Sequence, residues 1–168
     1  MVEKKNYATT QYPEKTDKKL KNARKWAIRG GVFNCIAAFP FALPFVFDNY
    51  INLFNDINSF LGFGGKLWIS PSEGANMLFL NTAGLALFLV GLTLLYASKN
   101  IVERAELSLF NGIIRFVWGF IAIYYIVSYE MIQIMFLIVI IDFVFASMYF
   151  YYYYQIYNIR FLKNKVAI

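Results

Sequence analysis

Residues 132–154 read IQIMFLIVIIDFVFASMYFYYYY, which is the most hydrophobic stretch of this 168-residue chain. A helix needs about 20 predominantly apolar residues to cross the hydrocarbon core of a bilayer. The stretch therefore predicts a transmembrane helix over residues 131–154. One ionisable residue, Asp142, lies near its centre, where an unpaired charge is costly. The same stretch thus predicts a membrane protein and marks a position where a function could be located.

Three further apolar stretches are long enough to span a bilayer, and they predict helices over residues 26–47, 71–98 and 107–127. The whole chain is 60% hydrophobic and 20% aromatic, whereas a soluble domain is about 45–50% apolar. We therefore expect an all-α fold, a bundle of four transmembrane helices over residues 26–154.

Two short sequence patterns predict the shape of the first helix and the start of the second. Pro40 and Pro44 interrupt the first helix, and because membrane helices tolerate proline we expect a kink rather than a break. Ser70-Pro71-Ser72-Glu73 predicts the start of the second helix. In that interpretation Ser70 is the N-cap, Pro71 occupies the first helical position and Glu73 reaches back to the backbone.

The connection between the first two helices is long, runs from Asp48 to Asn76, and contains both apolar and polar residues. Its apolar residues recur at helical spacing, which predicts a short amphipathic helix on the outer membrane surface. The sequence Gly62-Phe63-Gly64-Gly65 then predicts a turn, and Trp68 an anchor at the interface. The residues of the predicted apolar stripe are Leu53, Phe54, Ile57, Phe60 and Leu61.

Positive charge is concentrated in three segments. Residues 1–29 hold nine of the 16 Lys and Arg residues, and the others lie mostly between the second and third helices or near the C-terminus. Because basic loops stay in the cytoplasm, four spans with both ends inside place all three segments on one side. We expect a cell-membrane protein with basic cytoplasmic tails over residues 1–25 and 155–168, and no nucleic-acid partner.

The residue inventory limits the chemistry. The chain has no histidine and only one cysteine, Cys35. This composition removes the commonest metal ligand, the commonest general base, intramolecular disulfides and cysteine-based zinc patterns. We therefore expect no metal, no cofactor, no catalytic residue and no enzymatic activity. Cys35 lies in an apolar run and is interpreted as a small core residue.

A polar cluster is predicted inside the bundle. Arg115 and Asp142 lie at depths that differ by less than the reach of an arginine side chain, so an ion pair between them is feasible. The cluster is expected in the cytoplasmic half of the bundle, with Asn81 and Thr82 forming a separate contact nearer the outer side. Its members are Asn34, Asn111, Arg115, Asp142 and Tyr149.

Glycines at seven-residue spacing, Gly84 with Gly91 and Gly112 with Gly119, predict close helix packing. Tyr149 and tyrosines 151–154 are interpreted as an aromatic belt at the cytoplasmic interface, with a stacking surface for a quinone or sterol ring as the alternative.

The chain resembles the DoxX-like small membrane proteins and related uncharacterised bacterial and archaeal families. The resemblance rests on Asn34–Pro44 (NCIAAFPFALP), Gly84–Lys99 (GLALFLVGLTLLYASK) and Asn111–Arg115 (NGIIR). It covers about residues 26–154 and implies a four-helix membrane domain. Some members of such families look like accessory subunits of membrane oxidoreductases.

Three functions follow from these observations. The first is a non-catalytic accessory or assembly subunit that contacts other membrane subunits or a second copy. The second is a small transporter for protons or solutes, built on Arg115 and Asp142. The third is a lipid- or quinone-binding protein. In the first interpretation the Arg115–Asp142 pair fixes helix register, whereas in the second it belongs to the mechanism.

Overall fold

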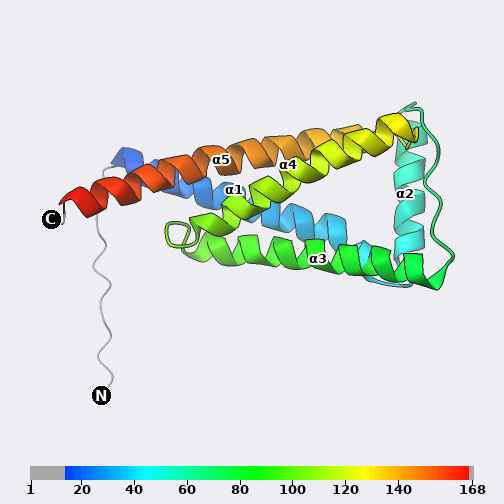
Figure 1. Ribbon diagram of the computed structural model, residues 1–168, viewed down its shortest axis with the longest axis horizontal. Helices are drawn as coiled ribbons and strands as arrows, with labels where there is room; N and C mark the ends of the chain where they lie inside the picture. Colours follow the sequence, from blue (N-terminus) through cyan, green and yellow to red (C-terminus); the bar gives the residue numbers. More distant parts are fainter. Residues whose placement is uncertain (1–13, 167–168) are drawn as a thin grey trace, which may run out of the picture.

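The computed structural model describes residues 14–166, and this part of the chain is helical throughout apart from its connections. Figure 1 shows the helices in chain order. The only strand-like pairing within the described residues is an isolated bridge between Lys66 and Met131. The elements are α1 (Glu14–Ala38), the 3-10 helix η1 (Phe39–Ala42), α2 (Phe47–Phe60), α3 (Gly74–Lys99), α4 (Ala105–Ser128) and α5 (Ile134–Val166).

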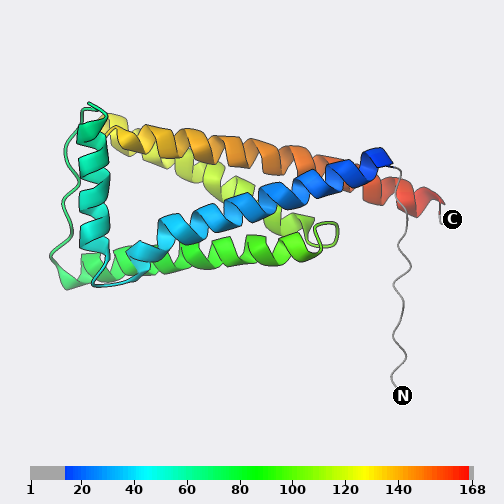
Figure 2. The same cartoon turned by 180° about the vertical axis from the view of Figure 1, so that it is seen from behind.

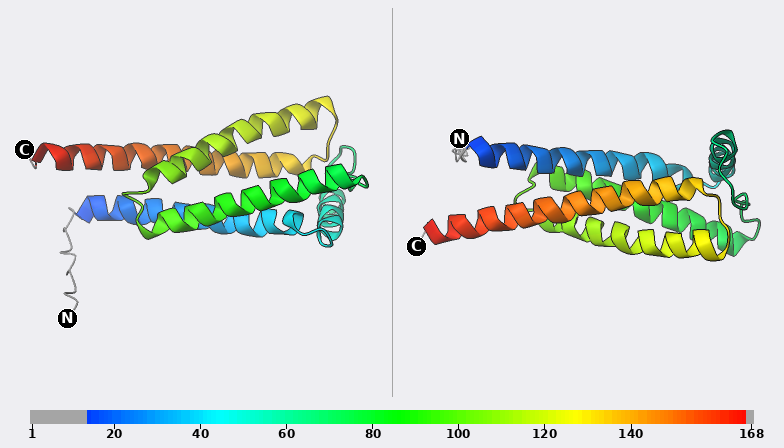
Figure 3. Two further views of the ribbon diagram at one scale, coloured as in Figure 1. Left: turned by 60° about the horizontal axis from the view of Figure 1, so that its bottom comes forward. Right: turned by 90° about the horizontal axis from the view of Figure 1, so that it is seen from above.

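The four long helices form two packed pairs. α1 lies along α3, and α4 lies along α5, whereas contact between α3 and α4 is limited (Figures 1 and 2). α1 begins and α5 ends at the same end of the bundle, which we call the terminal end. α2 runs across the opposite end, which we call the α2 end (Figure 3). The two pairs diverge toward the α2 end, and α2 bridges them there.

Three helices are long and apolar enough to cross a membrane: α3, α4 and, within α5, Ile134–Phe161. Only 17%, 33% and 39% of their most hydrophobic windows is buried inside the protein. Most of these apolar side chains therefore face outward, as expected for a multi-pass membrane protein in contact with lipid. The segment Thr16–Ala42 passes the same test only together with α2, from which it is bent by 119°.

The predicted kink in the first helix is wrong, because the chain breaks there. α1 ends at Ala38 and becomes η1, in which Pro40 sits in the first turn, where its missing N–H is tolerated. Leu43 precedes Pro44 and is extended, with φ −108° and ψ 119°. Proline disfavours the helical conformation at the residue before it. The two prolines therefore end the helix and turn the chain into α2.

The predicted start of the second helix at residue 71 is also wrong, since α3 begins at Gly74 and its N-cap is Glu73, not Ser70. The Asn55 side chain ties the preceding connection to α2. It donates to the Trp68 carbonyl at 2.8 Å and accepts from the Trp68 N–H at 2.9 Å. This pairing fastens the connection before α3 begins.

The amphipathic helix predicted in this connection corresponds to α2, and most of the predicted apolar stripe points away from the protein. Phe47, Ile51 and Asn58 are buried, whereas Leu53, Ile57, Phe60 and Leu61 are exposed and Phe54 is half-buried. Asn58 fastens the C-terminal end of α2. It donates to the carbonyls of Phe63 and Gly64 and accepts from the backbone N–H of Ile134 at 2.9 Å.

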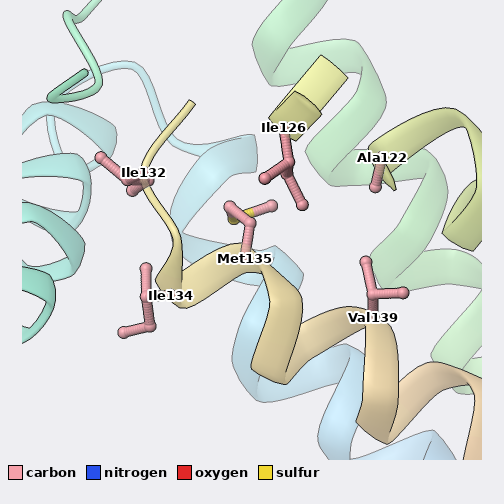
Figure 4. Packing of buried hydrophobic residues seen from close by; sticks show 6 residues of the cluster. All are labelled: Ala122, Ile126, Ile132, Ile134, Met135 and Val139. Atoms are coloured by element: carbon pink, nitrogen blue, oxygen red, sulfur yellow. The ribbon is translucent and has the colours of Figure 1, made fainter. Parts of the chain in front are cut away.

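One hydrophobic cluster packs α4 against α5 near the α2 end, and a second includes residues of α1 and α5 near the terminal end. Near the α2 end, Ile126 of α4 packs against Met135 and Val139 of α5 (Figure 4). Near the terminal end, Ala23 and Ala27 of α1 join a cluster with Ile156 of α5. α5 continues through residues 155–166, so this part of the predicted C-terminal tail is an extension of the last helix. The predicted N-terminal tail lies outside the described residues up to residue 13.

Candidate functional site

The predicted ion pair between α4 and α5 is present in the structure. The Arg115 Nη1 group donates to Asp142 Oδ1, and both residues are buried, with 4% and 7% of their surface exposed. They face one another because α4 and α5 pack along their length. Each charge balances the other in a region that water does not solvate, so neither is left unpaired.

Arg115 is also bonded to the other helix pair. Its Nε group donates to Asn111 Oδ1 at 2.8 Å, one turn earlier on α4. Its Nη2 group donates to Asn34 Oδ1 and, at 3.2 Å, to the Gly30 carbonyl, both on α1. Four of the five guanidinium N–H groups thus have acceptors. A single arginine therefore joins α1, α4 and α5.

Two aromatic rings cover the guanidinium. The Arg115 Cζ atom lies 4.7 Å from the ring centroid of Phe145 and 5.6 Å from that of Phe33. Cations are attracted to ring faces at such distances. The two rings therefore add to the stabilisation of the buried guanidinium.

Tyr149 closes the cluster toward the terminal end. Its hydroxyl lies 3.5 Å from the Trp26 carbonyl, its ring stacks on Phe145, and the residue is buried. A Cβ atom added to Gly30 would lie 1.6 Å from the Tyr149 hydroxyl oxygen. Gly30 is therefore the residue that lets both Tyr149 and Arg115 approach α1. The structure thus brings together all five predicted cluster residues.

Two buried polar atoms of α4 have no partner among the described residues, Ser108 Oγ and Asn111 Nδ2. Ser108 lies one turn from Asn111 toward the terminal end, beside a cavity of about 10 Å³ between α1, α4 and α5. A space of that size can accommodate about one water molecule. Sequence reasoning missed Ser108, although its three-residue spacing from Asn111 places it on the same helical face.

The four glycines singled out in the sequence lie at close helix contacts. Gly91 faces Gly31, Asn34 and Cys35 of α1, and Gly84 faces the backbone of η1. Gly112 and Gly119 instead receive aromatic side chains of α5. Added Cβ atoms would lie 2.5 Å from a backbone atom at Gly84 and 2.9 Å from one at Gly91, so these two contacts depend on the missing side chain. At Gly119 and Gly112 the atoms that a Cβ would meet first, at 2.6 and 3.0 Å, belong to aromatic rings.

Asn81 and Thr82 were predicted to form a second polar contact, and in the structure Asn81 makes it. Asn81 Nδ2 donates to the Phe41 carbonyl at 2.8 Å and so ties α3 to η1. This bond satisfies a carbonyl near the break in the helix. Thr82 is exposed on the adjacent position of α3.

A cavity of about 260 Å³ lies between the two helix pairs, with Arg115, Asp142, Asn34 and Asn111 in its lining. The rest of the lining is almost wholly apolar and comes from all six helices. At the α2 end the cavity is bounded by α2 and the extended connection, through Phe54 and Trp68. The large apolar side chains of its lining include Phe33, Phe41, Phe54, Trp68, Leu87 and Trp118.

The side of the cavity between α3 and α4 is open to the surroundings. Leu87 of α3 and Ile114 of α4 both line the cavity, yet they are 38% and 44% exposed. Ala83, one turn before Leu87, is also a lining residue and exposed. In a bilayer this opening would face lipid tails rather than water.

The residues that line the cavity offer apolar contact, one ion pair and side-chain amides. Within residues 14–166 no group of three or more His, Cys, Asp or Glu residues could hold a metal ion. Among these described residues, the Arg115–Asp142 pair is the only charged element in the cavity lining. The arrangement offers apolar walls, two charges that cancel and hydrogen-bonding groups at one end.

No protein-family model, curated protein or solved structure matches the chain. The resemblance to DoxX-like proteins therefore stays a prediction from the sequence.

Tyrosines 151–154, which the sequence suggested as a stacking surface, are not part of the cavity. Tyr151 and Tyr154 are exposed, whereas Tyr152 and Tyr153 pack at the terminal end. Sequence reasoning also missed the aromatic residues that line the cavity, because they come from five separate segments and are indistinguishable from ordinary apolar residues of a membrane helix.

Proposed function

We propose that this protein is a four-span membrane protein that binds a lipid-soluble molecule in the cavity between its two helix pairs. In this proposal α1 with η1 is the fourth span, α2 lies at the outer surface, and both chain ends face the cytoplasm. The basic residues 1–29 support that orientation. The molecule places a polar head at Arg115 and Asp142 and an apolar tail along the walls.

The observation that carries the proposal is an apolar cavity that ends on a buried, hydrogen-bonded ion pair. Ligand pockets commonly combine apolar walls with a few placed polar groups that fix orientation. An ion pair used only for helix register would not need a cavity beside it, since interiors otherwise pack densely.

Access from the bilayer supports a lipid-soluble ligand. The exposed lining residues Ala83, Leu87 and Ile114 are all apolar and lie on α3 and α4. A molecule already dissolved in the membrane can enter there without crossing a polar surface. The α2 end is held by Asn55 and Asn58, with their paired backbone bonds, so entry from the aqueous side would require breaking that connection.

The same geometry favours binding over transport. The cavity is bounded at one end by the Arg115 cluster and at the other by α2, Phe54 and Trp68. A transported solute needs access from both sides of the membrane, whereas the exposed residues of the lining lie at the side, on α3 and α4. The role of accessory subunit stays a prediction, and it is compatible with a bound lipid.

The experiment is to purify the protein from its native membrane in mild detergent and to quantify extracted lipids by mass spectrometry. Ala83→Phe places a ring at the mouth of the cavity, and Ala86→Phe is the matched control, because Ala86 is an exposed α3 residue outside the lining. We expect one lipid class near stoichiometry in the wild type and Ala86→Phe, and its loss in Ala83→Phe. Equal lipid content in all three proteins contradicts the proposal.

A further inference from the structure

The charge balance of the cavity restricts the head group that it can accept. In the part of the chain that the structure describes, Arg115 and Asp142 are the only ionisable residues of the lining, and they neutralise one another. An ionised carboxylate or phosphate head would bring a second negative charge beside Asp142 into a region of low dielectric. Such a charge would be uncompensated, which is costly inside a membrane.

The hydrogen bonds of the pair restrict the head further. Four N–H groups of Arg115 already have protein acceptors, so the guanidinium has one N–H left. Asp142 accepts the Arg115 bond through Oδ1, and no bond to its Oδ2 atom is present within the described residues. The site therefore has an unused carboxylate oxygen, which is a strong acceptor.

The size of the cavity sets how much of a ligand it encloses. A volume of about 260 Å³ is below the range of about 300–1,000 Å³ typical of sites for drug-sized ligands. A cavity of this volume can enclose a small polar head group and the first part of an apolar tail. The remainder of the tail would leave between Leu87 and Ile114, which are exposed at the opening.

We propose that the cavity selects an electrically neutral, hydroxyl-bearing lipid, whose hydroxyl donates to Asp142 Oδ2 and accepts from the remaining Arg115 N–H. This inference rests on the proposed function and specifies the ligand class. A long-chain alcohol or another lipid-soluble alcohol satisfies both hydrogen bonds. An ether or ester lacks the donor, and a fatty acid carries the wrong charge.

Three matched probes test the proposal: a brominated fatty alcohol, its methyl ether and the corresponding brominated fatty acid in its ionised form. Bromine quenches tryptophan fluorescence at short range, and Trp118 lines the cavity. A reporter protein with Trp26→Phe keeps the two tryptophans that line the cavity, Trp68 and Trp118, and is reconstituted in nanodiscs. The same reporter with Ala83→Phe gives the quenching that arises from the surrounding bilayer.

We expect saturable quenching by the alcohol at a concentration at least about tenfold lower than for the ether or the acid, since a hydrogen bond to a charged group contributes about that factor or more. In Asp142→Asn the charge of Arg115 is no longer neutralised, so the order reverses and the acid binds best. If that variant does not fold, the comparison of the three probes on the reporter protein alone tests the head-group selectivity.

The failures of the two proposals are distinguishable. An acid or ether that binds as tightly as the alcohol overturns the head-group selectivity and leaves the cavity as a lipid site. Quenching by all three probes that does not saturate, and that Ala83→Phe does not change, overturns the proposed function and the selectivity together.

Discussion

Replacing Asp142 by asparagine tests how much the Arg115–Asp142 pair contributes to stability. The change keeps the shape of the side chain and removes its charge. Arg115 would then be a buried cation with 4% exposure, bonded only to neutral acceptors on Asn34, Asn111 and Gly30. Removing one partner of a buried pair typically costs about 3–5 kcal/mol. Because asparagine can still accept from Arg115, we expect about 3 kcal/mol.

The assay is equilibrium unfolding in mixed micelles, followed by the loss of helical circular dichroism. Arg115→Gln and the double variant complete a double-mutant cycle, in which we expect a coupling energy of about 2 kcal/mol, since the double variant leaves no unpaired charge. Lys66→Gln is the control, because it breaks the Lys66–Glu130 pair, whose side chains are 72% and 71% exposed. Exposed pairs contribute little, so no measurable change is expected.

A loss in Asp142→Asn no larger than that in Lys66→Gln would refute this reasoning. A coupling energy near zero would do so as well, because it would mean that the two charges do not depend on one another.

Two further changes test the helix contacts with the same unfolding assay. Gly91→Ala is expected to cost about 1–3 kcal/mol, because its Cβ would lie 2.9 Å from three atoms of α1. Gly74→Ala, where nothing lies within 4 Å, should be neutral or slightly stabilising; equal effects of the two would contradict close packing at Gly91. Asn58→Ala is expected to cost about 2–3 kcal/mol, since it removes three hydrogen bonds and leaves the N–H of the buried Ile134 without its Asn58 acceptor. Asn52→Ala, an exposed α2 position, should leave stability unchanged, and the account of the α2 end fails if the two behave alike.

The helical character of the chain could be predicted, because a run of about 20 apolar residues that crosses a membrane satisfies its backbone hydrogen bonds by forming a helix. The ends of the helices were harder to predict. The break after Ala38 depends on two prolines acting together, and α3 begins at Gly74, three residues after the predicted first helical position. Local patterns indicate where a helix is favoured better than they indicate the residue at which it begins or ends.

The ion pair could be predicted because charges are rare inside membrane helices and must be compensated. Asn34 and Asn111 were found for the same reason. The cavity could not be predicted, because its volume depends on the divergence of two helix pairs and not on any residue type. The roles of Gly30 and Ser108 likewise depend on Tyr149 and on the small space beside α4.

The most direct test of the central claim is photo-crosslinking in a bilayer with a fatty alcohol that carries a diazirine near its hydroxyl group, followed by peptide mapping. We expect saturable labelling of lining residues of α3 and α4, such as Leu87, Ile114 and Trp118, and its loss in Ala83→Phe. Labelling confined to outward-facing residues such as Phe79 and Ile121, unchanged by Ala83→Phe, would contradict the claim that the cavity binds a lipid.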